Sequence, residues 1–544
     1  MGDERPDRPA QRPIGEGEGT EILVSTPGVE GGERTAPPPK LRSKAVNRQQ
    51  MTWAAIDVEQ LVPPDHLVRA IWELVGQLDL RRFWADTKAV EGVAGCSPYD
   101  PRLLISLWVL AYSDRVSSAR EVARRCAYHP AYQWLTGLSV ISHRTLSGFR
   151  VEYQEELDEL FAQVLAVLRS EEMITLERVM QDGTKVKAAA SPASFHREAK
   201  LRQHLEEARA RVEQMGDPQQ EGGPEPGRRQ QQAQARAARE KVARMEAALE
   251  ELKKVQAEAA AQSHPVSECR VSESEPQARK MKQAVGGGFA PSYNVQLVTD
   301  AAQDIIVGVR VVEARNDQQQ LEAGLEEVER QMGAVPQQAV VDEGYLSRAT
   351  VLDMEQRGVD LIAGGGLDPK PKNSLRTRQN CHQRGVTPEF YPENFVYDAE
   401  HNLYLCPAGQ PLRYLGVKRD REGVNRHHYR AKGSTCRGCP RHAQCCPSPG
   451  KKIQGRTIVR TENVPVVAAF VDKMKTPEAQ AIYRERKRIA EFPNLWLKEK
   501  LGLRRFRVRG LLKATCEAIW ACLTYNIQQW ARQRWKLKLT AATA

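Results

Sequence analysis

The chain has 544 residues, more than one hydrophobic core usually organises, and its 41% hydrophobic and 27% charged residues are typical of folded, water-soluble domains. Its 80 Lys and Arg outnumber its 69 Asp and Glu, so the net charge of +11 favours a polyanionic partner. The longest apolar run, residues 103–112, reaches only about half a membrane span, and no secretory signal opens the sequence. Its eleven cysteines are then reduced thiols or metal ligands, and we expect a cytoplasmic protein that binds no membrane.

The first part of the chain divides into a tail and a helical segment. Residues 1–47 are rich in Gly, Pro, Glu and Arg and lack aromatic residues, which predicts a disordered tail. Residues 48–172 are interpreted as a helical domain, because apolar residues recur at spacings of three and four and short polar turns separate the periodic segments. Such short helices favour a helix-turn-helix-like DNA-binding domain. A helical bundle used for packing or dimerisation is the alternative.

The pattern changes to strands between residues 173 and 366. Turn-bounded, β-branched runs predict strands at 176–182, 293–299, 305–312, 337–342 and 359–363, and a helix at 347–356. These elements predict an α/β fold with a mixed sheet and flanking helices, preceded by the all-α N-terminal domain. Asn316 and Asp317 follow the third of these strands and could line a site, although a turn is the simpler interpretation.

Residues 194–262 interrupt this sheet with two helical stripes. The first stripe comprises Leu201, Leu205, Ala208, Val212 and Met215, and the second comprises Val242, Met245, Leu249 and Leu252. A Gly- and Pro-rich turn at 216–227 separates them, so we predict an antiparallel helical hairpin that serves as a structural or multimerisation arm.

Residues 367–460 are predicted to form a Cys-rich insertion with a zinc site. Four thiols stand on two knuckle-like turns of this segment: Cys406, Cys436, Cys439 and Cys445. Four thiolates suit a closed, structural Zn²⁺ site. Cys446 could replace Cys445, and His442 or His428 could substitute for a thiol. Free cysteines in a loop-rich segment are the alternative interpretation.

Residues 461–544 are predicted to complete the α/β core with a basic helix at 481–500. Tyr483, Lys487 and Glu491 are four residues apart and Lys498 follows seven later, so all four can share one helical face. Pro493 argues against one continuous helical face, because proline removes a helix hydrogen bond and tends to kink the axis. The alternative is a solvated basic face with Glu491 as an ion-pair partner. Residues 514–535 are interpreted as a packing helix.

Three acids are the candidates for catalysis. Asp182 and Asp342 are each expected to end an apolar strand beside a cleft, and Glu491 lies on the late helix. Together such carboxylates can bind Mg²⁺ or Mn²⁺, and two ions can activate a water or a 3′-hydroxyl for attack on a phosphodiester. Glu343 adjoins Asp342, but adjacent strand residues point to opposite faces, so Asp342 is preferred. The alternative is that these aspartates only begin turns.

Several motifs together resemble a known family. They are Gln-Asp-Gly-Thr-Lys at 181–185, Ala-Arg-Lys-Met at 278–281 with Tyr-Asn-Val-Gln at 293–296, Val-Asp-Glu-Gly-Tyr at 341–345, and Tyr483…Glu491…Lys498. In this order the chain resembles the DDE transposases of bacterial insertion sequences, in the branch with a Tyr-x2-Arg-x3-Glu-x6-Lys signature. Residues 97–150 resemble their N-terminal transposase domain. Four residues separate Arg486 from Glu491, one more than in the signature, so the arginine role is open between Arg486 and Lys487.

The resemblance implies an RNase H-like core in which Asp182, Asp342 and Glu491 bind Mg²⁺ and catalyse DNA cleavage and strand transfer. Tyr483, Lys498 and either Arg486 or Lys487 would hold DNA phosphates. The implied partner is double-stranded DNA, both terminal repeats and target, bound by a homodimer or a higher synaptic assembly at the nucleoid. Two alternatives are a catalytically silent, transposase-derived DNA-binding protein and an RNase H-like nuclease without strand transfer.

Overall fold

A computed structural model describes residues 51, 55–85, 98–214, 225–261, 263–283, 287–367, 375–419, 423–447 and 455–543. Residues 1–55 and 56–544 are separate units, and everything below concerns the second. The tail predicted at 1–47 and most of the turn predicted at 216–227 lie outside the described residues. Within the described part of the chain, no helix is long and apolar enough to cross a membrane.

The N-terminal region of this unit is helical, as predicted. Its helices are α1 (Leu67–Val75), α2 (Pro101–Ser113), α3 (Ala119–Tyr128), α4 (Pro130–Thr136), α5 (His143–Glu152) and α6 (Gln154–Ser170). Asp100 caps α2, and Pro101 begins it, where a missing N–H costs nothing. Short 3-10 turns at Val58–Leu61 and Arg81–Trp84 flank α1.

The long C-terminal helix α16 (Leu511–Thr543) packs against α1, α2, α5 and α6. Its residues Trp520, Leu523, Ile527 and Trp530 are all buried, which confirms the prediction of a packing helix. Trp520 Nε1 donates to the carbonyl oxygen of Arg150 at 3.1 Å, at the end of α5. The two ends of the described chain therefore share one hydrophobic core.

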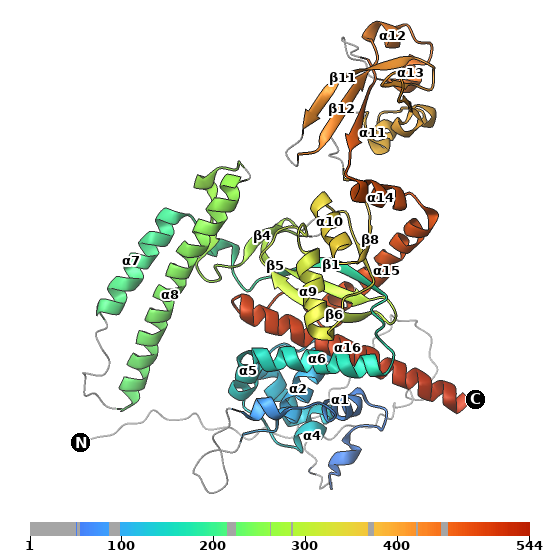
Figure 1. Cartoon of the computed structure of the whole chain (residues 1–544). Coiled ribbons are helices and arrows are strands. Elements are labelled where there is room, and N and C mark those ends of the chain that lie inside the picture. The colour runs from blue at the N-terminus through green and yellow to red at the C-terminus, as the bar shows by residue number, and fades with distance from the viewer. Residues whose placement is uncertain are drawn as a thin grey trace, which may run out of the picture. The chain divides into compact units, whose positions relative to one another are not determined.

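A six-stranded mixed sheet forms the centre of the fold (Figure 1). Its strands are β1 (Arg178–Lys187), β4 (Arg279–Lys282), β5 (Phe289–Asp300), β6 (Ile305–Val312), β7 (Gln338–Val341) and β8 (Asp360–Ala363). β1, β7 and β8 are parallel, and β5 pairs antiparallel with β1, β4 and β6. Helices α9 (Leu321–Met332) and α10 (Arg348–Gln356) flank the sheet. The predicted class, a mixed α/β sheet preceded by helices, is confirmed.

One strand boundary was predicted wrongly. Asp182 does not end its strand, because β1 continues for five more residues to Lys187. The extension is stabilised by the antiparallel partner, which pairs with β1 from Val179 to Lys187. The parallel partner β7, in contrast, pairs only with the first three residues of β1. Asp182 therefore lies just where β7 ends.

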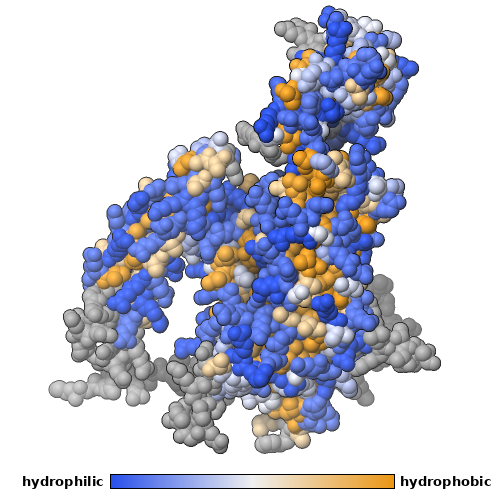
Figure 2. Space-filling model, viewed as in Figure 1, coloured by the Kyte–Doolittle hydropathy of each residue, from blue (hydrophilic) through white to orange (hydrophobic). Residues whose placement is uncertain are grey.

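The insertion after β1 contains the predicted helical hairpin. Helices α7 (Glu198–Gln214) and α8 (Glu225–Ala261) contact each other, and both are flanked by the short paired strands β2 (Phe195–His196) and β3 (Val271–Ser272). Of the predicted stripes, Leu201, Leu205, Met245 and Leu252 are buried, whereas Val242 and Leu249 are only half-buried. Figure 2 shows hydrophilic residues over most of the hairpin's visible face. Two 3-10 turns, Pro192–Ser194 and Val266–Glu268, connect to the short strands.

The Cys-rich segment contains its own sheet of order β13-β12-β11-β10-β9. The strands are β9 (Val396–Asp398), β10 (Leu403–Leu405), β11 (Pro411–Arg419), β12 (Asn425–Arg430) and β13 (Thr457–Glu462). Its helical turns are α11 (Arg378–Gln383), Pro388–Phe390, Pro392–Asn394, α12 (Gly433–Arg437) and α13 (His442–Cys445). Helices α14 (Pro465–Lys473) and α15 (Pro477–Glu499) follow, and α15 continues through Pro493 as one helix.

Candidate active site

Two carboxylates leave the centre of the sheet side by side. β1 and β7 pair in parallel, with Arg178 opposite Gln338 and Met180 opposite Val340. Continued by two residues, this register sets Asp182 level with Asp342, which directly follows β7. Because neighbouring strands lie about 4.8 Å apart, both side chains begin at adjacent points on one face.

Helix α15 covers this face of the sheet. Met180 and Val340 each precede one of the two aspartates by two residues, and both pack against Ile489 and Ala490 of α15. Strand residues two apart share a face, so Asp182 and Asp342 face α15 as well. Apolar packing thus fixes the position of this helix, and the polar residues one or two turns further along it lie near the carboxylates.

Asp182 has two partners on α15. Asn494 Nδ2 donates to Asp182 Oδ2 at 2.9 Å, and Arg486 Nη1 lies 3.9 Å from Asp182 Oδ1. Burial raises the pKa of the Asp182 carboxyl to about 6; Arg486 lowers this pKa, and the nearby Asp342 and Asp317 raise it. The carboxyl is therefore ionised at neutral pH, although much of its solvation is lost.

Two polar atoms beside Asp182 have no hydrogen-bond partner among the described residues. They are Nη1 of Arg486 and Oδ1 of Asn494, and both are buried. A buried polar atom without a partner is costly, and such atoms are uncommon in folded proteins. The cleft thus offers one donor and one acceptor to an incoming ligand. Sequence reasoning missed Asn494, whose one signal is its spacing of eight residues from Arg486 along the same helical side.

A third acid, Asp317, approaches the cleft from the end of β6. Its Oδ1 accepts from Asn294 Nδ2 at 2.8 Å and from Gln296 Nε2 at 2.6 Å. A Cβ added at Gly183 would lie 2.1 Å from this oxygen, so only glycine permits the approach. Asp317 does open a turn, as predicted, but its side chain also borders the site.

A hydrogen-bonded chain connects Tyr345 to Asp317 through Gln296. The buried hydroxyl of Tyr345 donates to Gln296 Oε1, and Gln296 in turn donates to Asp317. Burial raises the pKa of Tyr345, and Asp317, Asp182 and Asp342 raise it further. The hydroxyl therefore remains a neutral donor, and this network fixes the side chains beneath the cleft.

Glu491 lies on the same helix, one turn before Asn494. Its exposed side chain lines a pocket together with Thr184, Lys487, Asn494 and Lys498. Asp182, Asp342 and Glu491 do not, however, bring three oxygens within 4.8 Å of one another. Carboxylates that would share two metal ions need not all meet at one point.

The remaining predicted residues take different positions. Tyr483 lies against Gly364, since a Cβ there would be 2.0 Å from the tyrosine hydroxyl oxygen. Arg486 faces Asp182, whereas Lys487 is exposed beside Glu491. Glu343 lies over Gly365, whereas Asp342 is close enough to Asp182 to raise the pKa of its carboxyl. The geometry thus favours Arg486 over Lys487, and Asp342 over Glu343, as neighbours of Asp182.

A basic groove begins at this cleft. Besides Gly183 and Asp317 it is lined by five cations: Lys185, Lys187, Lys282, Lys498 and Arg504. Burial lowers the pKa of Lys498, as does Arg504, whereas Asp182 and Glu499 raise it. Cations gathered beside half-buried carboxylates provide an attractive surface for a phosphate backbone.

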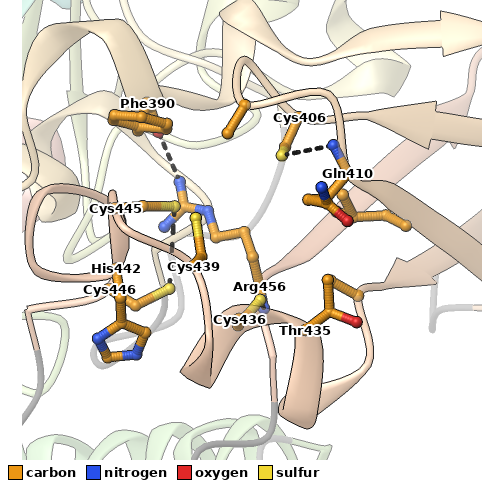
Figure 3. Close-up of a pocket in the computed structure, with 13 residues that line it drawn as sticks. Phe390, Cys406, Gln410, Thr435, Cys436, Cys439, His442, Cys445, Cys446 and Arg456 are labelled. Carbon is orange, nitrogen blue, oxygen red and sulfur yellow. Dashed lines mark hydrogen bonds between the residues drawn. The ribbon is translucent and has the colours of Figure 1, made fainter.

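The Cys-rich segment contains a second candidate metal site. A cavity of about 30 Å³ is lined by Cys406, Cys436, Cys439, Cys445 and Cys446 (Figure 3). The N–H groups of Gln410 and Arg456 donate to the sulfurs of Cys406 and Cys436, at 3.2 and 3.4 Å. The sulfurs are not all within 4.8 Å of one another, although Cys445 and Cys446 lie 3.9 Å apart.

Arg456 brings a buried positive charge to this cavity. Its Nη2 donates to Phe390 O at 3.1 Å and to Cys381 Sγ at 3.5 Å, while its Nε and Nη1 have no hydrogen-bond partner among the described residues. Burial raises the pKa of the Cys436 thiol. A guanidinium beside several thiols would offset the negative charge that thiolates carry around a metal ion.

Two parts of the chain match known protein families. Residues 405–531 match the family described as "Transposase DDE domain", and residues 56–152 match "Transposase domain (DUF772)". The chain is a DDE-type transposase of insertion sequences. No curated protein matches it. The first match spans both the cysteines and Glu491 in this transposase, whereas Asp182 and Asp342 lie outside both matched ranges.

Proposed function

We propose that this transposase binds the terminal repeats of its element and cuts and joins DNA strands with Asp182, Asp342 and Glu491. The observation that carries the proposal is the parallel register of β1 and β7, which sets two acids level beneath α15. In this proposal the sheet is an RNase H-like core, which the DDE family implies. Residues 48–172 are its DNA-binding domain, residues 194–262 are a hairpin insertion within 173–366, and residues 461–544 complete the core.

The acids fit Mg²⁺ or Mn²⁺ as the catalytic cofactor. Asp182 is a half-buried carboxylate, and Arg486, the nearest cation among the described residues, is 3.9 Å away, so its charge is only partly compensated. Carboxylate oxygens are the ligands that these hard ions prefer. When bound, such ions supply positive charge at phosphate oxygens and lower the pKa of a water or hydroxyl.

The chain's own residues position the DNA for this reaction. Asn494 and Arg486 fix Asp182, and each retains a polar atom free for substrate. Lys498 borders both the Glu491 pocket and the basic groove, so its ammonium can hold a phosphate between them. The groove cations then bind the flanking backbone without regard to sequence.

In residues 367–460, Zn²⁺ is proposed to have a structural role. The supporting observations are a cavity of about 30 Å³, room for a single small ligand, and two N–H···S hydrogen bonds. A closed set of thiolates leaves no position for substrate, so this ion would stabilise the fold of the segment.

Assembly as a homodimer or a larger synaptic complex is part of the same proposal. Terminal repeats occur at both ends of an element, and joining them requires two active sites. The α7–α8 hairpin, largely hydrophilic on its surface, is available as the multimerisation arm.

The direct test uses labelled duplexes that carry the DNA flanking the gene, incubated with the purified protein and Mg²⁺. We expect nicking at the element boundary and then joined products with a second duplex. Glu491→Gln should abolish both reactions, whereas Glu499→Gln, the same change two turns along α15, should leave them intact. Binding by fluorescence anisotropy should be retained in both variants.

Other outcomes would select the alternatives. Retained DNA binding without cleavage by the wild-type protein would indicate a silent, transposase-derived binding protein. Cleavage that depends on Glu491 but yields no joined product would indicate a nuclease. Cleavage that Glu491→Gln does not reduce would refute the proposed site.

A further inference from the structure

Three metal-ligand side chains meet at the base of the hairpin insertion. His204 Nδ1 lies 2.7 Å from Glu273 Oε2, and His196 Nε2 lies 3.7 Å from the same oxygen. The two imidazole rings are 5.2 Å apart and nearly perpendicular. One ligand atom from each residue lies within 4.8 Å of the other two, and no other such set occurs among the described His, Cys, Asp and Glu residues.

Each of these residues stands on a different piece of ordered backbone. His196 ends β2 and pairs with Val271 of β3, and Glu273 directly follows β3. The N–H of Glu273 donates to Ser194 O at 2.9 Å, which extends the pairing to the ligand itself. His204 lies on α7 beside the buried Leu205. The convergence is therefore built by the fold and does not depend on a loop conformation.

The site is partly shielded from solvent. The side chains of His196, His204 and Glu273 are 15%, 21% and 31% exposed. An ordinary hydrogen-bonded ion pair would explain why His204 contacts Glu273. Such a pair does not explain why the second imidazole, that of His196, faces the same oxygen. The addition of His196 is what distinguishes a three-ligand site from an ion pair.

We propose that His196, His204 and Glu273 bind a divalent transition-metal ion, for which Zn²⁺ and Co²⁺ are the probes. Two imidazoles and one carboxylate are a ligand set that such ions accept, with water in the remaining positions. Mg²⁺ prefers oxygen ligands alone, so this site differs in chemistry from the aspartate cleft. It also differs from the thiol cavity, which offers sulfur.

The ion would tie together three parts of the insertion. The chain enters the hairpin through β2 and returns through β3, so a His196–Glu273 link closes the whole insertion into a loop. His204 adds the second turn of α7 to the link. Closing a long loop removes conformational freedom from the unfolded insertion, and the bound ion would also fix the direction in which α7 leaves the two strands.

The test measures metal binding by the full-length protein after removal of metal with EDTA and dialysis against Co²⁺. The proteins are wild type, His196→Ala, Glu273→Gln and the matched control His264→Ala, an exposed histidine just after α8. We expect His196→Ala and Glu273→Gln to bind about one ion fewer per chain than the other two proteins. Their thiolate-to-cobalt charge-transfer absorption should be unchanged, because that band reports the cysteines.

A second measurement follows the fold itself. Zn²⁺ should slow amide hydrogen exchange in residues 195–205 and 271–273 in the wild type and in His264→Ala, and should leave exchange unchanged in His196→Ala. Equal metal content in all four proteins, or exchange that Zn²⁺ does not slow in the wild type, overturns the proposal. Because neither readout uses DNA, the outcome is independent of the proposed transposition chemistry.

Discussion

The aspartate cleft and the thiol cavity are both candidate metal sites, but the chain builds them in different ways. Asp182, Asp342 and Glu491 come from two strands and a helix that are far apart in the sequence. The four thiols come from one segment: Cys406 follows β10, Cys436 and Cys445 lie on α12 and α13, and Cys439 lies between these two helices. The cleft therefore exists only when the whole sheet and α15 have formed, whereas the thiol site depends on local structure.

The surroundings differ as well. The cleft opens onto a groove lined by five cations, so a polyanion can reach its carboxylates. The thiol cavity has room for little more than one ion, and Arg456 and Phe390 are among the residues that line it. An open site with oxygen ligands suits chemistry on a bound substrate, and a closed site with sulfur ligands suits stabilisation. Each of the following changes affects one region and should leave the other intact.

The largest effect is expected from Asp342→Ala. Loss of a carboxylate that holds the catalytic ion should lower the rate of DNA cleavage by about 10³-fold or more, measured on labelled element ends. Glu343→Ala removes the adjacent acid, which extends over Gly365, and should change the rate less than about threefold. Zinc content should be equal in both variants. Equal losses of activity would show that the structure assigns the wrong acid.

Cys439→Ser should disrupt the thiol cavity and leave the aspartate cleft intact. Removal of one thiol is expected to release zinc and to increase hydrogen exchange across residues 396–462, because such ions contribute folding energy directly. Mg²⁺ binding at the cleft, followed by calorimetry, should persist. Cys269→Ser, whose sulfur lies outside the cavity, is the control. Unchanged zinc content in Cys439→Ser would remove this thiol from the ligand set.

Arg486→Ala should slow cleavage by about 10²-fold, because it removes a cation that lies 3.9 Å from Asp182 and a donor with no hydrogen-bond partner among the described residues. Lys487→Ala should cost only a few-fold, and its effect should fade with added salt, as expected for an exposed phosphate contact. Arg486→Lys should not restore activity, since an ammonium cannot reproduce the guanidinium geometry. If Lys487→Ala slowed cleavage more than Arg486→Ala, Lys487 would fill the arginine position of the signature.

Local patterns predicted much of this arrangement. The strand predicted at 305–312 is β6 residue for residue, and β7 ends one residue before Asp342, where the strand was predicted to end. The end of β1 could not be predicted, because Gly183 and the two residues after it lack an apolar alternation and are held by pairing with β5. A turn was the simpler interpretation of Asp317, but its side chain also borders the cleft, against Gln296 and Gly183, which pair across β5 and β1.

The sequence also could not predict in which direction the side chains of a helix point. Arg150, in a helix predicted to bind DNA, is buried; its Nη1 donates to Ser117 O at 2.5 Å, and its guanidinium lies 4.9 Å from the ring centre of Trp108. Asn494 is a neutral amide among many cations, and nothing in its neighbours indicates that it bonds Asp182. A helix presents its residues in all directions, and tertiary packing alone decides which side faces a site.

The smallest expected effect concerns stability and pH. Burial raises the pKa of Asp182 from its ordinary 3.8 to about 6, so the protonated carboxyl is favoured in the folded protein. This contribution to stability is fully present below pH 4 and is lost as the pH rises through 6. At pH 7.5 the ionised Asp182 should therefore destabilise the metal-free protein by on the order of 2–3 kcal/mol.

Asp182→Asn removes that charge and should raise the melting temperature of the metal-free protein at pH 7.5 by about a few degrees. The gain should shrink as the pH falls from 6 toward 4, where wild-type Asp182 is neutral. Mg²⁺ should stabilise the wild type at pH 7.5 and have little effect on the variant, because the ion then neutralises a charge that the variant lacks. Asp472→Asn, at a side chain that is 74% exposed, should change none of these values. A gain that does not depend on pH would mean that packing, and not the buried charge, sets the cost at this position.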